Sequence, residues 1–148
     1  MNKQSKRIIQ SVLFVIAELL WVFVPQFKQR MLSRFFGTIH GYYEKFSPFT
    51  LLSEGKYNSE LYIIVFWALL ALAVSGLILQ IKGNRNTFSK IASFAPFISC
   101  VLTDILVLTG VINLIADGSL SIISWGYLTG AITFVLCLAG YILNREEN

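Results

Sequence analysis

The sequence predicts an all-α membrane protein: a four-transmembrane-helix bundle with an interfacial amphipathic helix between spans 1 and 2. Three observations support this fold class. Residues 61–81 form a run of 21 residues without a charge, which as a helix would be about 31 Å long, close to the roughly 30 Å hydrocarbon core of a bilayer. Only 14% of the 148 residues are charged, against about 25% in an average soluble protein. The charges lie in short segments between apolar runs, as membrane topology signals do.

The first predicted span covers residues 8–27 and follows a short basic segment with Lys3, Lys6 and Arg7. A basic segment before an apolar run is also typical of a signal peptide, but no small-residue cleavage site follows this run. We therefore expect an uncleaved helix that ends near Pro25.

Residues 27–46 differ from the spans because apolar and polar residues separate onto two halves of a helical wheel. Aromatic residues such as Phe27 and Phe35 occupy one half, and Arg30 and Arg34 occupy the other. A basic amphipathic helix beside a span usually lies in the headgroup layer. The pattern therefore predicts an interfacial helix, although its two glycines weaken helix propensity.

Further apolar runs complete a predicted single integral membrane domain, residues 1–148. The spans are expected at residues 61–81, 98–116 and 120–143. Between the first two of these runs, Asn86 or Thr87 is expected to open a short helix leading toward Pro96. Asp117-Gly118-Ser119 forms a predicted turn that makes the last two spans an antiparallel pair.

Four spans place both termini on the same side of the membrane. Seven basic residues then fall on that side and five on the other, so the positive-inside rule favours cytoplasmic termini. The basic amphipathic segment would lie outside the cell, where a eukaryotic plasma membrane carries little anionic lipid. We therefore expect a bacterial plasma membrane.

Two ionisable residues, Glu18 and Asp104, lie within the predicted spans. A charge at the bilayer centre costs about 2.5–3.5 kcal/mol on insertion scales, so such residues usually face the bundle interior. One interpretation is a shared intramembrane proton or cation site. The other is two structural carboxyls, each hydrogen-bonded inside the bundle, with Ser99 and Thr103 available near Asp104.

The fourth span carries small residues in helical register, which predict a helix-packing seam. They are Gly126, Gly130, Thr133, Cys137 and Gly140. The first two have the GxxxG spacing that allows another helix backbone to approach closely. The partner of this seam is either the third span or a second copy of the protein.

No motif indicates enzymatic chemistry. The sequence has no nucleophile elbow, P-loop or dinucleotide-binding glycine motif. Its single histidine, His40, and its cysteines, Cys100 and Cys137, lack metal-ligand spacing. We expect no catalysis, cofactor, metal or nucleic-acid binding.

The preferred interpretation is therefore a small polytopic protein in the lipid bilayer that binds a membrane partner as an accessory or interaction protein. The alternative is a small proton- or cation-linked transporter or channel subunit that uses Glu18 and Asp104. Four helices leave little room for a water-filled path, so the alternative requires a homo-oligomer.

Overall fold

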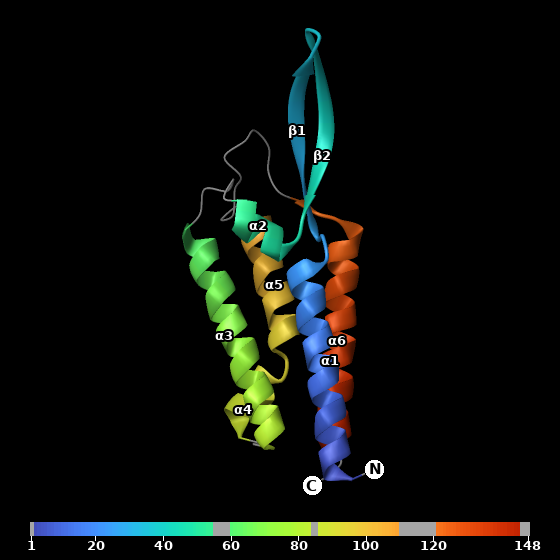
Figure 1. Cartoon of the computed structure of the whole chain (residues 1–148), viewed down its shortest axis with the longest axis vertical. Helices are drawn as coiled ribbons and strands as arrows, with labels where there is room; N and C mark the ends of the chain where they lie inside the picture. Colours follow the sequence, from blue (N-terminus) through green and yellow to red (C-terminus); the bar gives the residue numbers. More distant parts are fainter. Residues whose placement is uncertain (1, 55–59, 84–85, 110–120, 146–148) are drawn as a thin grey trace.

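The computed structural model describes residues 2–54, 60–83, 86–109 and 121–145, which are mostly helical. The helices are α1 (Lys3–Phe23), α2 (Pro48–Glu54), α3 (Glu60–Lys82), α4 (Thr87–Ala92), α5 (Ala95–Leu108) and α6 (Ser124–Arg145). The strands are β1 (Phe27–Phe35), β2 (Thr38–Phe46) and β3 (Ser121–Ile122). The helices α1, α3, α5 and α6 lie side by side, and β1 and β2 project from one end (Figure 1). The helix α1 begins, and α6 ends, at the opposite end.

The first helix, α1, has a clear signal at each end. It begins after Asn2, whose side-chain oxygen accepts a hydrogen bond from the Ser5 backbone N–H at 2.8 Å and so caps the helix. It ends at Phe23 because Val24 has an extended backbone, the conformation favoured directly before a proline such as Pro25. The helix therefore starts earlier than predicted and stops short of residue 27.

The predicted amphipathic helix over residues 27–46 is wrong, because the segment is a β-hairpin. The strands β1 and β2 pair antiparallel from Phe27 opposite Phe46 to Phe35 opposite Thr38. Phe36 and Gly37 form the turn with φ of 50° and 78°, and positive φ at both positions is what a two-residue type I′ hairpin turn requires.

The helical wheel failed here because of the spacing of its apolar residues. Phe27, Met31 and Phe35 are four residues apart, which fits about one helical turn and also two repeats of a strand. Phenylalanine and tyrosine favour strands, and Gly37 disfavours a helix. These preferences, together with the turn geometry, decide the structure.

The hairpin is held at its base by a third strand. Two residues of β3, Ser121 and Ile122, pair with Lys28 and Phe27, which gives the strand order β2-β1-β3. Because these residues are in a strand, α6 begins at Ser124 rather than at residue 120 as predicted.

Gln26 joins three elements at this base. Its N–H donates to the Phe46 carbonyl at 3.0 Å, and its carbonyl accepts from the Ile123 N–H at 3.0 Å. Its side-chain Nε2 donates to the Trp21 carbonyl at 2.7 Å. The side chain is fully buried, so this residue ties α1 to the hairpin and to the start of α6.

The remaining helices agree in part with the sequence. The apolar run over residues 61–81 lies within α3, and Asn86 caps α4 by accepting from the Ser89 N–H at 2.8 Å. Pro96 lies in the first turn of α5, which ends at Leu108. The rest of the predicted third span, residues 110–116, and the predicted turn at 117–119 lie outside the described residues.

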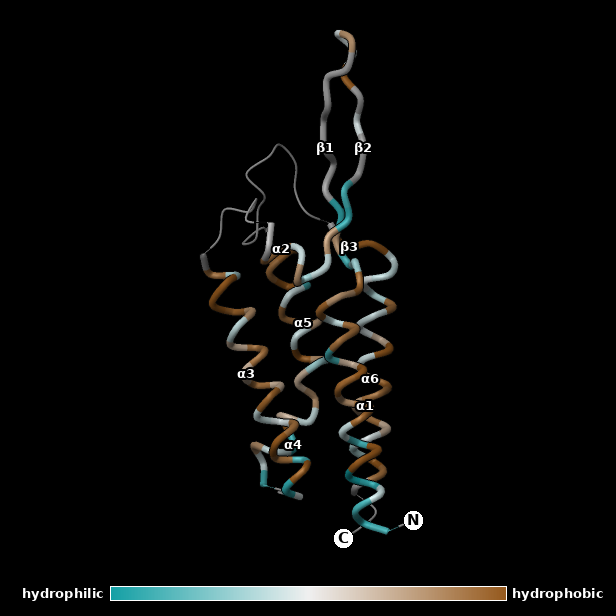
Figure 2. Tube along the Cα trace, viewed as in Figure 1, coloured by the Kyte–Doolittle hydropathy of each residue, from teal (hydrophilic) through white to brown (hydrophobic). Residues whose placement is uncertain are grey.

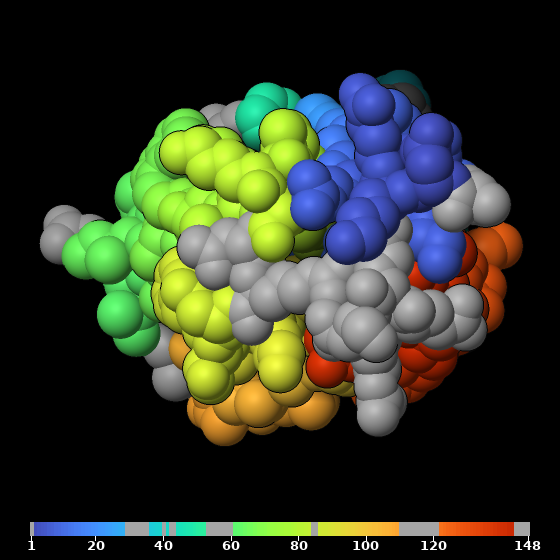
Figure 3. All heavy atoms as spheres, turned by 90° about the horizontal axis from the view of Figure 1, so that it is seen from below, coloured from blue at the N-terminus to red at the C-terminus, as the bar shows by residue number. Residues whose placement is uncertain are grey.

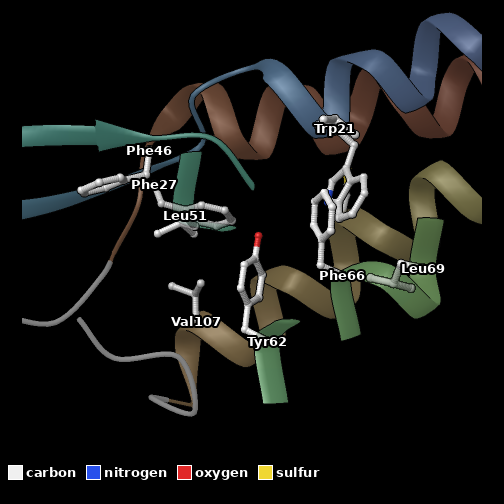
Figure 4. Packing of buried hydrophobic residues seen from close by; sticks show 10 residues of the cluster. Trp21, Phe27, Phe46, Leu51, Tyr62, Phe66, Leu69 and Val107 are labelled. Atoms are coloured by element: carbon white, nitrogen blue, oxygen red, sulfur yellow. The ribbon is translucent and has the colours of Figure 1, made fainter. Parts of the chain in front are cut away.

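The larger hydrophobic core lies where the hairpin base meets the helices (Figure 4). Trp21 of α1 stacks on Phe66 of α3 with ring centroids 5.3 Å apart. The Tyr62 hydroxyl donates to the Pro48 carbonyl at 2.6 Å. The buried members are Trp21, Val22, Phe27, Phe46, Leu51, Tyr62, Phe66, Leu69, Cys100 and Val107. The first and last residues of the hairpin are thus part of the core.

Two described helices are long and apolar enough to cross a membrane, over Leu61–Lys82 and Ser124–Leu143. Only 28% of each apolar window is buried inside the protein, whereas the core helix of a water-soluble protein is mostly buried. Figure 2 shows hydrophobic residues along the helices and hydrophilic residues at the ends far from the hairpin. The structure is thus mostly helical, with two helices compatible with membrane association.

Candidate functional site

The candidate site is a buried polar cluster between α1, α5 and α6, where apolar residues would be expected. Each member apart from Glu18 is at most 8% exposed. The cluster consists of Gln10 and Glu18 of α1, Ser99, Cys100 and Thr103 of α5, and Thr133 and Cys137 of α6. Polar groups in such a place are costly unless they are hydrogen-bonded, so their partners show how the cluster is built.

The hydroxyls of α5 are satisfied within their own helix. Ser99 Oγ donates to the Ala95 carbonyl at 2.8 Å, and Thr103 Oγ1 donates to the Ser99 carbonyl at 2.7 Å. Such back-bonding lets a small polar side chain lie inside an apolar helix packing. Trp21 Nε1 donates to Thr103 Oγ1 at 3.3 Å, which links α1 to α5.

Thr133 connects α6 to the same cluster. Its Oγ1 donates to the Gly130 carbonyl at 2.8 Å and lies 3.6 Å from Cys100 Sγ. Cys137, one turn further along α6, lies near Cys100. Both cysteines are free and buried, so they pack as small side chains at the meeting of the helices.

Glu18 is the member of the cluster whose polar atoms lack hydrogen-bond partners within the ranges that the structure describes. Both of its carboxylate oxygens are buried and have no hydrogen-bond partner among the described residues. Glu18 lies near the thiols of Cys100 and Cys137. Ser11, two turns earlier on the same face of α1, also has a buried hydroxyl without a partner there. A buried carboxyl in this setting is stabilised by a proton or by a bound cation.

Asp104, the second predicted acid, follows Thr103 on α5 and is half-buried. One of its oxygens, Oδ1, is buried without a partner in the described part of the chain. Both acids lie near the Cys100 thiol. No hydrogen bond joins them, because neither Glu18 oxygen has a partner. A site shared by the two acids stays a prediction.

The small residues of α6 differ in how closely other parts of the chain approach them. A Cβ placed at Gly140 would lie 2.9 Å from Gln10 Cγ of α1, and one at Gly126 would lie 2.8 Å from the Gln26 carbonyl. A Cβ at Gly130 would meet nothing within 4 Å. Thr133 and Cys137 are buried. The close approaches therefore lie toward the two ends of the predicted seam.

Metal binding finds no support in the described residues, since they contain no group of three or more His, Cys, Asp or Glu that could hold an ion. His40 lies in β2, where it pairs with Ser33 of β1. The sequence analysis had predicted a helix at this position, with His40 on its polar face, but His40 is a strand residue.

Sequence reasoning missed two features that concern function. One is the hairpin, and the other is Gln26, which joins α1 to the hairpin and to the start of α6. The available signal was Gly37, a residue type favoured in two-residue hairpin turns, between two runs rich in aromatic residues that favour strands. No local pattern marks Gln26, because its partners come from distant elements.

Comparisons with protein-family models, curated proteins and solved structures give no match to this chain. Its function is therefore inferred from its own geometry and chemistry.

Proposed function

We propose that this chain is an integral protein of a bacterial plasma membrane, with four spans and cytoplasmic termini. In this proposal it acts without catalysis, as an accessory protein that binds a membrane partner. The observation that carries the proposal is the outward-facing apolar surface of the long helices. Ile64 of α3 is 66% exposed and Leu108 of α5 is 67% exposed.

Exposed apolar side chains occur on all four long helices. Examples are Ile8, Val12 and Leu19 of α1, Ile63, Trp67 and Val74 of α3, Ile105 of α5, and Trp125, Leu128 and Val135 of α6. A water-soluble monomer rarely exposes apolar patches larger than a few hundred Å². Lipid tails remove the cost of such a surface, so a bilayer suits these helices better than water.

A binding role is favoured over catalysis by the kind of polar interactions inside the bundle. The hydroxyls of Ser99, Thr103 and Thr133 donate to helix carbonyls and so are used to build the helix packing. The hairpin, in contrast, projects away from the helices (Figure 1). A projecting element of this size is suited to contact another molecule.

Alkaline carbonate extraction and crosslinking in native membranes test the proposal together. The chain should stay in the membrane pellet after carbonate treatment and should crosslink to a different membrane protein. Release of the chain into the supernatant would exclude the integral membrane assignment. A chain that stays in the pellet but crosslinks only to itself would exclude the accessory role.

A second candidate function is a proton- or cation-linked transporter subunit, and the unpartnered oxygens of Glu18 favour it. Purified protein in liposomes should then carry a pH-dependent flux that Glu18→Gln and Asp104→Asn abolish. Glu44→Gln in the hairpin is the matched control. Equal flux in all variants and in empty liposomes would eliminate this alternative.

A further inference from the structure

The hairpin separates its charges between its two faces. Directly opposed residues in an antiparallel pair share a face, and residues two apart along a strand share it too. By this register one face holds a set of basic residues, which we call the basic face: Lys28, Arg30, Arg34 and Lys45. The single acidic residue of the hairpin, Glu44, occupies the other face.

The tip of the hairpin is apolar. Phe36 is 91% exposed and Ile39 is 61% exposed. Phe36 also has φ of 50°, in the left-handed region where asparagine, aspartate or glycine is favoured at this turn position. For a bulky residue this conformation costs of order 1–2 kcal/mol. A strained and exposed phenylalanine is disadvantageous for folding, so a role in binding is a reasonable explanation for it.

The position of the hairpin argues against its own membrane as the binding surface. Each strand has nine residues and is therefore about 30 Å long. The hairpin continues the long axis of the helices (Figure 1). If the helices cross the bilayer, Phe36 lies far out in the water, beyond the lipid headgroups.

We infer that the hairpin is a docking arm for a second protein with an acidic surface outside the membrane. This inference rests on the proposed membrane function. Phe36 and Ile39 would enter an apolar pocket of that protein, and the basic face would lie against its carboxylates. Complementary charge around an apolar centre is the usual build of a protein interface.

Other binding partners fit the hairpin less well than an acidic protein surface. A second copy would bring two basic faces together, and like charges in an interface are costly. A nucleic acid would satisfy the basic face, and its bases can stack on an aromatic ring, but with the proposed cytoplasmic termini the hairpin lies outside the cell, away from nucleic acid. The acidic protein surface is the partner that suits the charge, the apolar tip and this location.

Site-specific photocrosslinking tests the inference. A benzoylphenylalanine is introduced at Phe36 in the full-length chain, expressed in its native host, and irradiated in whole cells. We expect an adduct with a different protein, with the crosslinked peptide mapped by mass spectrometry to an acidic segment outside the membrane. The matched control carries the same group at Ile81, which is exposed in the last turn of α3, at the end of the bundle away from the hairpin (Figure 1), and should not label that segment.

The charge contribution is tested in the same cells. The double variant Arg30→Glu with Arg34→Glu should reduce the Phe36 adduct at least tenfold, while Glu44→Gln on the other face should leave it. Equal thermal unfolding of the detergent-solubilised variants shows that a lost adduct is not caused by misfolding. An adduct that persists in the double variant would overturn the inference.

Four other results would also overturn it: an adduct with phospholipid, with nucleic acid, with a second copy of the chain, or no adduct at all. Carbonate extraction of the same samples separates this failure from failure of the membrane proposal. A chain that stays in the pellet without the expected adduct refutes only the docking arm. A chain that is released refutes the membrane proposal.

Discussion

At the scale of single residues, Gln26 has the largest structural role that its type would not suggest. Its Nε2 donates to the Trp21 carbonyl at 2.7 Å, near the C-terminal end of α1, inside a fully buried environment. Gln26→Ala removes this donor and leaves the Trp21 carbonyl unpaired, which costs about 1–3 kcal/mol; part of this cost is offset because Gln26 Oε1, which is buried without a partner among the described residues, is removed as well. We expect a clear decrease of Tm in detergent.

Gln4→Ala is the matched control for this prediction, because Gln4 is exposed on α1 and its loss should leave Tm nearly unchanged. If the two alanine variants unfold at the same temperature, Gln26 does not hold the junction between α1, the hairpin and α6.

Two helical glycines should respond in opposite ways to alanine. A Cβ at Gly76 of α3 would lie 2.5 Å from the Ala92 carbonyl of α4, whereas one at Gly130 of α6 would meet nothing within 4 Å. Gly76→Ala should destabilise the protein by about 1–3 kcal/mol through overpacking. Gly130→Ala should be neutral or stabilising by up to about 1 kcal/mol, because alanine favours a helix.

Thermal unfolding of both variants in the same detergent measures this difference. A loss of stability in Gly130→Ala equal to that in Gly76→Ala would mean that another backbone packs on Gly130, as in a dimer through the predicted seam. The sequence singled out Gly130 by its GxxxG spacing, but spacing does not reveal which helix face is covered. Gly76 carries no such pattern, although it is the glycine of this pair on which another helix packs closely.

At the scale of elements, the sequence predicted the features that local chemistry determines. The apolar run of α3 and a short helix that opens at Asn86 or Thr87 were visible from residue types. Residues 27–46 were not predicted correctly, because a four-residue apolar spacing fits both a helix and a strand. The pairing of β3 with β1 joins residues 121–122 to residues 27–28, and no local pattern reports such a distant contact.

The hairpin should be separable from the fold of the helices. Among the hairpin residues whose side chains the structure describes, only Phe27 and Phe46 belong to the buried core. Replacing residues 29–44 with Asn-Gly keeps Lys28 opposite Lys45 and supplies a favourable two-residue turn. We expect a Tm within a few degrees of that of the full chain, measured by thermal unfolding in detergent.

The same shortened chain also tests whether the hairpin binds the partner protein. It should still resist carbonate extraction but should no longer co-purify with the protein that Phe36 crosslinks. A chain that cannot be purified folded would contradict this separation, and it would show that the distal hairpin contributes to the helix packing.

At the scale of the whole molecule, the two ends differ in kind. The hairpin and α2 lie at one end, and the start of α1 lies at the other, beside the end of α3 (Figures 1 and 3). There, a Cβ at Gly83 would collide with the Arg7 guanidinium. Basic residues of α1, α3 and α4, namely Lys3, Lys6, Arg7, Lys82 and Lys90, thus lie at the end that we propose to be cytoplasmic.

Cysteine labelling of intact cells tests this orientation. Ile39→Cys places a thiol at the exposed hairpin tip, and Lys3→Cys places one at the exposed start of α1. The native cysteines are buried, so background labelling should be low. With cytoplasmic termini, a membrane-impermeant maleimide should label Ile39→Cys in intact cells and Lys3→Cys only after permeabilisation. The reverse pattern would place the hairpin in the cytoplasm, so that any partner of the docking arm would be a cytoplasmic protein. Labelling of both sites in intact cells would contradict a membrane between the two ends.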